Sequence, residues 1–180
     1  MSKFFIFCLC SFSIIGSCVL ADQVFSPPSI KVASGFEVRL AASDPIVKYP
    51  MMACFDDFGH LYVAESDGRN LTTRAAIERE LPRFVRRLVD VDGDGVFDKS
   101  TIFADRMTMP EGGVWYNGAL YIISAPYLWR LEDIDGDGVA DKRDKILGTM
   151  EFDGRANQHG PYLGPNGRMY FSGGHFGYDL

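Results

Sequence analysis

An internal repeat is the feature that most constrains what this chain can fold into. Gly59-His-Leu-Tyr62 recurs as Gly118-Ala-Leu-Tyr121 and again as Gly167-Arg-Met-Tyr170, so the three tyrosines are 59 and 49 residues apart. Each copy places a glycine turn directly before a short β-type run, and each follows a proline. The repeat therefore predicts a series of similar hairpins.

A second repeat interleaves with the first. The segment Arg87–Lys99 (RLVDVDGDGVFDK) matches Arg130–Lys142 (RLEDIDGDGVADK), shifted by 43 residues. Repeats of about 40–50 residues that contain several short strands are typical of the blades of a β-propeller. The alternative is two unrelated hairpins that share turn chemistry by chance. We favour the repeat, because the two patterns recur at compatible spacings.

The sequence thus predicts an all-β fold, specifically a β-propeller with six blades when complete. Residues 35–180 hold about three repeats, whereas a propeller closes with about 4–8 blades. We therefore expect the N-terminal portion of a propeller, truncated at its C-terminus. Residues 36–40 alternate apolar and polar side chains, as a half-buried strand does, and residues 58–64 indicate a turn followed by a strand.

The longer first repeat contains a non-β segment between Glu65 and Pro82. Thr72 or Thr73 is a suitable N-cap, helix-compatible residues follow, and Pro82 ends the run, which predicts a short helical insertion. Most charge runs of this kind are solvated faces, and the alternative is a local basic rim for an anionic ligand. The basic residues in and after the insertion are Arg69, Arg74, Arg79, Arg83, Arg86 and Arg87.

The N-terminus predicts export to the periplasm or the cell surface. A lysine and an apolar stretch of about a dozen residues precede a small-residue cleavage pattern, so residues 1–21 are expected to be a signal peptide. Alternatively, residues 15–18 form a lipobox and Cys18 carries a lipid, or the signal is retained as an anchor. Either would be the protein's only membrane contact. Residues 22–34 are an extended, proline-containing leader.

Charge and cysteine usage narrow the classes of function. The chain carries 24 acidic against 18 basic residues, a net charge of −6, which argues against a nucleic-acid binder. Only Cys54 lies beyond the signal region, so no disulfide framework is expected. The sequence has no Cys-x-x-Cys-His motif, which excludes a c-type haem in these residues.

Two aspartate-rich loops are the strongest sign of a chemical function. Calcium takes six to eight oxygen ligands, and a tight loop supplies them from positions 1, 3, 5, 7, 9 and 12, with a glycine at position 6. We expect two calcium sites in strand-flanked loops, the second being the better because it has a carboxylate at position 12; the alternative is a pair of Asp-Gly hairpin turns. The ligands would be Asp90, Asp92, Asp94, the Val96 carbonyl and Asp98 in the first loop, and Asp133, Asp135, Asp137, the Val139 carbonyl, Asp141 and Asp144 in the second.

His159 is the candidate catalytic residue. It lies directly before a predicted strand, on a glycine- and proline-rich segment that a propeller would bring near its ligand-binding axial face. Histidine exchanges protons near neutral pH and is the commonest general acid or base, although a loop histidine is more often structural or merely exposed. His60 lies in a turn and is expected at the surface, and neither His60 nor His175 is favoured for catalysis.

Taken together, these residues resemble the PQQ-dependent glucose/sorbosone dehydrogenase-like β-propellers. The closest resemblance is to the N-terminal domain of the membrane-bound dehydrogenase-like proteins typical of planctomycetes and their relatives. It runs from about residue 35 to the end of the chain. It rests on Gly35-Phe-Glu-Val38, on Asp-Gly-Asp-Gly followed by Asp-Lys, and on the stretch His159–Tyr170 (HGPYLGPNGRMY).

The resemblance implies a function. In those enzymes a histidine in the place of His159 is the general base that takes a substrate hydroxyl proton while hydride passes to PQQ. Gln158 stands where they tend to have an orienting acid. We therefore expect an exported, calcium-bearing propeller that oxidises a sugar or alcohol with PQQ. The residues that bind PQQ would lie beyond residue 180. The alternatives are a non-catalytic propeller that binds carbohydrate or protein, and a metal-dependent hydrolase or lactonase.

Overall fold

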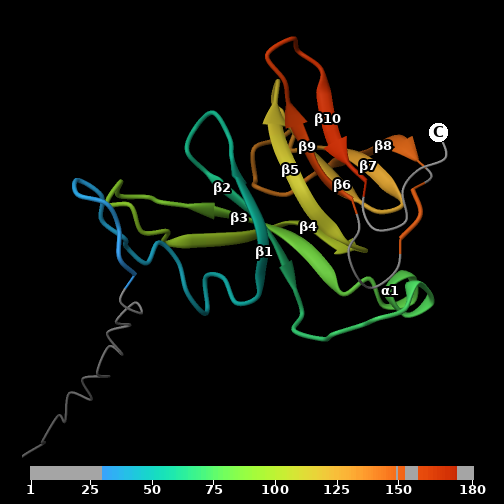
Figure 1. Cartoon of the computed structure of the whole chain (residues 1–180), viewed down its shortest axis with the longest axis horizontal. Helices are drawn as coiled ribbons and strands as arrows, with labels where there is room; N and C mark the ends of the chain where they lie inside the picture. Colours follow the sequence, from blue (N-terminus) through green and yellow to red (C-terminus); the bar gives the residue numbers. More distant parts are fainter. Residues whose placement is uncertain (1–29, 149, 153–157, 174–180) are drawn as a thin grey trace, which may run out of the picture. The chain divides into compact units, whose positions relative to one another are not determined.

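The computed structural model describes residues 30–148, 150–152 and 158–173 (Figure 1). The predicted signal peptide, Cys18, most of the leader and His175 lie outside the described residues. The chain divides into two compact units, residues 1–38 and residues 39–180, and all the strands belong to the second. No helix in the described part is long and apolar enough to cross a membrane.

The first sheet has four antiparallel strands in the order β1-β2-β3-β4 (Figure 1). Its strands are β1 (Pro50–Phe55), β2 (Leu61–Ser66), β3 (Arg83–Val89) and β4 (Lys99–Met107). Because every neighbour in the sheet is also a neighbour in the sequence, each connection joins adjacent strands. The connections are therefore free to carry insertions at the two ends of the sheet.

The second sheet repeats the same order, β5-β6-β7-β8, and is followed by a two-stranded hairpin. Its strands are β5 (Pro110–Tyr116), β6 (Ala119–Ser124), β7 (Tyr127–Glu132) and β8 (Lys142–Gly148). The hairpin is β9 (His159–Leu163) with β10 (Met169–Ser172). β5 packs against β1 on one side and against β9 on the other, so the first strands of the three repeats lie next to one another.

The sequence repeats correspond to equivalent positions in these sheets. Tyr62, Tyr121 and Tyr170 each lie on the second strand of a hairpin, directly after its glycine turn. The two aspartate loops both connect the third strand of a sheet to the fourth. The all-β prediction is confirmed, and the sheets are open and antiparallel.

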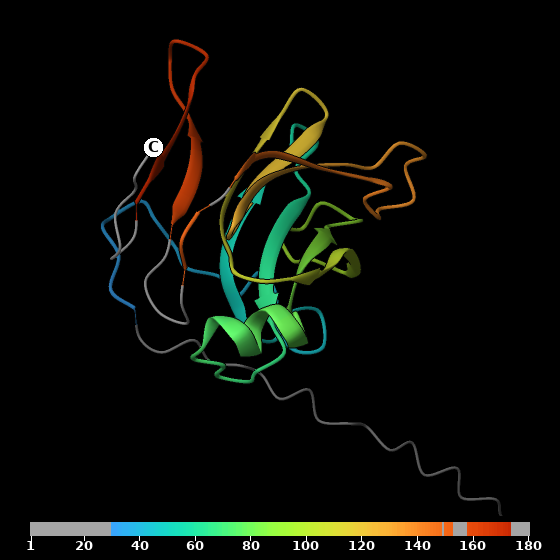
Figure 2. The same ribbon diagram turned by 90° about the vertical axis from the view of Figure 1, so that its right-hand side faces the viewer.

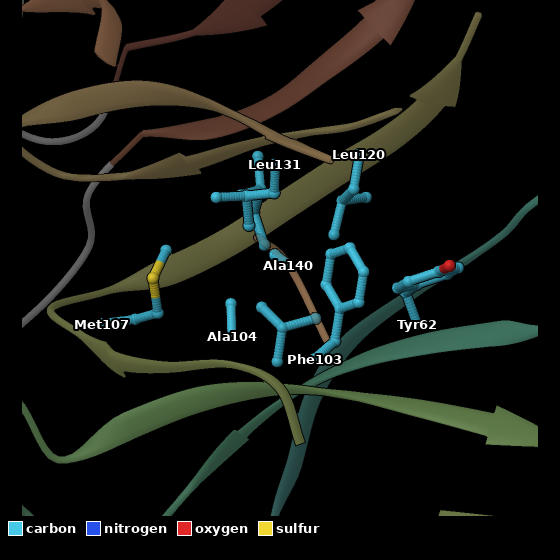
Figure 3. Packing of buried hydrophobic residues seen from close by; sticks show 9 residues of the cluster. Tyr62, Phe103, Ala104, Met107, Leu120, Leu131 and Ala140 are labelled. Atoms are coloured by element: carbon cyan, nitrogen blue, oxygen red, sulfur yellow. The ribbon is translucent and has the colours of Figure 1, made fainter. Parts of the chain in front are cut away.

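The largest buried cluster lies between the first two sheets (Figure 3). It joins Tyr62 and Phe103 of the first sheet to Leu120 and Leu131 of the second. The Tyr62 ring meets Phe103 edge-on at a centroid distance of 4.8 Å and stacks on Trp115 at 5.2 Å. Burying a side chain of this size contributes about 1.5–3 kcal/mol, so this layer fixes one sheet against the other and with it the loops that each sheet carries.

The predicted helical insertion is confirmed as α1 (Arg74–Glu80). Thr73 is the N-cap, and its hydroxyl accepts a hydrogen bond from the Ala76 amide at 3.3 Å. Ile77 is the buried residue of the helix and packs with Met109 and Ala125. The helix therefore lies at the end of the sheets where the β4–β5 and β6–β7 connections run (Figure 2).

The prediction of a strand at residues 36–40 is wrong. These residues form no strand, and the Phe36 amide instead bonds the Ala33 carbonyl in a turn. The side chains of Phe36, Val38 and Leu40 are all exposed. Alternation in sequence makes a strand only where a neighbouring chain completes the ladder, and no described strand pairs with this segment. The turn and strand predicted at residues 58–64 are confirmed, with β2 beginning at Leu61.

Candidate functional site

The first aspartate loop is held in shape by its own carboxylates. Asp90 accepts hydrogen bonds from two glycine amides, Gly93 at 2.8 Å and Gly95 at 2.9 Å. Both glycines have positive φ angles, 77° and 91°, which let their amides turn toward the carboxylate. Asp98 closes the loop by accepting the Val91 amide at 2.8 Å. The loop conformation is therefore specified by local aspartate–amide bonds.

The second loop has the same hydrogen bonds. Asp133 accepts the amides of Gly136 and Gly138 at 2.7 and 2.9 Å, and Asp141 accepts the Ile134 amide at 2.7 Å. The two loop sequences match at every aspartate and glycine from position 1 to position 9. Two separate segments of the chain thus adopt the same loop conformation at equivalent positions in the two sheets.

Each loop gathers three carboxylates at positions 1, 3 and 9. In each trio the donor oxygens all lie within 4.8 Å of one another; the trios are Asp90, Asp92 and Asp98, and Asp133, Asp135 and Asp141. Calcium–oxygen distances are about 2.3–2.6 Å, so two ligands of one ion lie at most about 5 Å apart. The spacing and the all-oxygen donor set fit calcium, and a cation would offset the repulsion between the carboxylates.

The remaining predicted ligands lie outside these trios. Asp94 and Asp137 each accept the amide two residues further on, at 2.8 Å. Those amides belong to Val96 and Val139, whose side chains are exposed. Asp144 lies within β8 and forms an ion pair with Lys142 at 3.2 Å. The same three positions converge in both loops. The geometry therefore gives no reason to expect stronger calcium binding at the second loop than at the first.

His159 is the first residue of β9, and its side chain is exposed. Its Nδ1 atom lies 3.2 Å from the carbonyl oxygen of Glu111 in β5. A carbonyl oxygen only accepts hydrogen bonds, so this contact places the proton on Nδ1 and leaves the lone pair on Nε2. Gln158 is buried and donates to the Glu151 carbonyl oxygen instead. A backbone carbonyl, and not a side-chain acid, thus contacts the ring.

Gly112 of β5 allows β9 to approach this closely. A Cβ atom on Gly112 would lie 2.3 Å from the Gly160 amide nitrogen and 2.5 Å from its carbonyl oxygen. Both distances are far below van der Waals contact, so a side chain at Gly112 would push the strands apart. The contact between His159 and Glu111 therefore depends on glycine at position 112, next to Glu111.

His60 lies in the β1–β2 turn, as predicted, but its side chain is half-buried, at 22% exposed, and not fully at the surface. Its Nδ1 lies 2.8 Å from Asp56 Oδ2, and the Asp56 side chain is only 2% exposed. Asp56 also accepts the amides of Phe58 and His60, so it caps the β1–β2 turn and orients the imidazole. The available sequence signal was an aspartate four residues before the histidine, at the head of a strand.

Arg87 and the second aspartate loop adjoin this histidine. The Arg87 Nη2 atom is 3.1 Å from Nδ1 and 3.2 Å from Nε2 of His60. The Arg87 guanidinium thus contacts the imidazole through one atom that lies close to both ring nitrogens. A pocket of about 300 Å³ is lined by these side chains together with Trp115 and Asp133. Burial, and then the nearby Asp56 carboxylate, raise the pKa of the Tyr62 hydroxyl in its wall.

The arginines after β2 do not form a common basic rim, because separate partners hold most of them. Arg69 pairs with Asp67 at 2.6 Å, and Arg86 pairs with the buried Glu65, also at 2.6 Å. Arg83 is largely buried and donates to the Thr108 carbonyl oxygen at 2.7 Å. The other ion pairs of this series are Arg69–Glu80, Arg74–Glu78, Arg74–Glu151 and Arg79–Glu80.

Comparison with known proteins gives one match. The model of a family described as a domain of unknown function, DUF7133, matches residues 25–180. That span includes both aspartate loops, His60 and His159. No curated protein and no solved structure matches the chain.

Proposed function

The chain belongs to the DUF7133 family, and we propose that it forms part of an exported, calcium-binding β-propeller. The observation that carries this proposal is the recurrence of one hydrogen-bonded aspartate loop at the same place in two four-stranded sheets. Adjacent first strands of successive repeats also support a propeller, since the innermost strands of its blades surround a common axis.

The three converging carboxylates of each loop would hold a calcium ion, which would supply the positive charge that offsets their repulsion. The role that fits this geometry is structural, because the loops connect outer strands and the bonds within each loop are local. An ion bound to the folded chain alone stabilises it by mass action, by about 2.7 kcal/mol per site when the free ion is at 100 times its Kd.

Calorimetric titration of the chelator-treated protein with calcium tests this proposal. We expect two ions per chain, and we expect Asp92→Asn and Asp135→Asn each to remove one. Asp57→Asn is the matched control, since Asp57 is an exposed aspartate of the β1–β2 turn and belongs to neither trio. Zero or one ion in the unaltered protein, or a loss caused by Asp57→Asn, would contradict the assignment.

The catalytic part of the proposal is oxidation of a sugar or alcohol, with His159 as general base and PQQ as the hydride acceptor. The contact from Nδ1 to the Glu111 carbonyl supports it, because this tautomer presents a basic Nε2 atom. PQQ carries carboxylates, and no described lysine or arginine is hydrogen-bonded or ion-paired at His159. We therefore assign no described residue to the cofactor, and the PQQ proposal rests on the family resemblance.

PQQ binding by the intact protein is the first test, followed by dye reduction with a panel of sugars and alcohols. His159→Asn is the informative variant, because the Asn amide can still donate to the Glu111 carbonyl while it lacks a basic nitrogen. A positioned general base contributes about 10²–10⁴ in rate, so we expect at least a hundredfold loss of turnover with an unchanged melting temperature. If PQQ does not bind, the non-catalytic carbohydrate- or protein-binding propeller becomes the better proposal.

A further inference from the structure

A second pocket lies at the other end of the β7–β8 hairpin from the aspartate loop. It has a volume of about 270 Å³ and is lined by the C-cap of α1, the end of β4 and one face of β7 and β8. This volume is just below the range for drug-sized ligands, about 300–1,000 Å³, and suits a smaller molecule. The pocket shares no lining residue with the aspartate loops or with His159.

Two aromatic rings form one wall of the pocket. Tyr127 and Trp129 are two residues apart on β7, and their rings meet edge to face at a centroid distance of 5.7 Å. Gly148 is the cross-strand partner of Tyr127, and a Cβ atom there would lie 2.5 Å from the Tyr127 ring. Glycine at this position therefore lets the ring lie against β8 and face the pocket.

Lys145 is the cross-strand partner of Trp129 and brings a charge to this wall. Its ammonium lies 4.1 Å from the centroid of the Tyr127 ring and 5.2 Å from that of Trp129. The cation–π contacts hold the ammonium at the aromatic surface. An anionic group that stacks beside the rings would therefore meet a positioned cation.

Arg106 supplies a second cation. Within the described residues neither Arg106 nor Lys145 has a carboxylate within ion-pair distance, whereas Arg69, Arg79 and Arg143 all do. The one acid in the lining is Glu78, and its carboxylate already accepts from Arg74 at 2.9 Å. The side chains that line the pocket therefore carry a net positive charge.

The backbone at the pocket mouth is unusual. Leu81 and Arg106 have φ angles of 46° and 53°, and they are two of the three described non-glycine residues with positive φ. The pairing of β3 with β4 shifts register between Arg83 and Val85, directly opposite Arg106. Such bulges redirect side chains and are common beside binding sites. Here the bulge lies at Arg106, the residue that brings the second positive charge to the pocket.

We propose that this pocket binds a sugar acid, a hydroxylated ring that carries a carboxylate. The apolar C–H face of the ring packs against the aromatic wall, and the carboxylate pairs with Lys145 and Arg106. The inference goes beyond the proposed function, because it involves neither calcium, PQQ nor His159.

Titration of the intact protein with glucuronate, with glucose as the uncharged control, tests the inference. We expect glucuronate to bind about tenfold more tightly than glucose. We also expect its binding to weaken as the salt concentration rises, because Arg106 and Lys145 are exposed. Lys145→Met keeps the aliphatic contact with the rings, and Arg106→Asn keeps a residue that tolerates positive φ. Each variant should weaken glucuronate binding by about three- to fivefold.

Lys142→Met is the matched control, since Lys142 lies on the same strand but pairs with Asp144. It should leave the affinity within about twofold of the unaltered protein, because an exposed ion pair outside the pocket contributes little. Failure of glucuronate to bind overturns the inference, as does equal binding of glucose. A loss caused equally by Lys142→Met would show that overall charge, not the pocket, attracts the ligand.

Discussion

Replacing Glu65 is expected to be among the most destabilising single changes outside the hydrophobic core. Glu65 lies in β2 and is 1% exposed. Its carboxylate accepts from the backbone amides of Lys48 at 2.8 Å and Tyr49 at 3.2 Å, and from Arg86 Nε at 2.6 Å. One side chain thus ties the segment before β1 to β2 and β3.

The size of the effect follows from what Glu65→Ala leaves behind. Breaking a buried ion pair by removing one partner costs about 3–5 kcal/mol. Arg86 keeps its bond to Ser100 Oγ at 2.8 Å and its place over the Phe84 ring, so we take the lower end. A loss of about 3 kcal/mol lowers the Tm of a domain of this size by roughly 6–12 °C.

Thermal unfolding followed by circular dichroism measures the change. Glu80→Ala is the control, because Glu80 is also paired with arginines but is exposed, and it should shift Tm by no more than about 2 °C. Glu65→Gln should fall between the two, since an amide oxygen still accepts the backbone amides but its NH₂ group faces Arg86. Equal shifts for Glu65→Ala and Glu80→Ala would refute the argument from burial.

Three further outcomes are expected. Gly112→Ala should separate β5 from β9 and speed amide hydrogen exchange in the β9–β10 hairpin, whereas Gly113→Ala, whose nearest contact at 3.2 Å is the flexible end of Met52, should do so much less. Burial, and then Asp56, raise the pKa of the Cys54 thiol to about 11, so iodoacetamide should react slowly with the folded protein near neutral pH. Because only the unfolded chain ionises its thiol between about pH 9 and 11, the free energy of unfolding should fall over that range. Asp144→Asn should leave calcium binding unchanged while Asp141→Asn removes one site, a contrast that calorimetry would reveal.

The sequence alone determined the features that depend on neighbouring residues. Aspartates that bond amides two to five residues away and glycines with positive φ define a loop wherever they occur, so the two repeats revealed equivalent loops before any strand was placed. The helix was predictable for the same reason, because the Thr73 cap and Pro82 act within one turn of its ends. Residues 36–40 show the limit of such reasoning, since a strand also requires a partner.

Only the tertiary structure decided which side chains meet across the sheets. The carbonyl that orients His159 belongs to Glu111, 48 residues earlier, and Arg87 reaches His60 from 27 residues away. Arg106 and Lys145 come to one pocket from different sheets, through a bulge in β4 and the register of β7 with β8. No local sequence pattern predicts these contacts, because they follow from how the buried faces of two sheets pack. That packing depends on all the core residues at once.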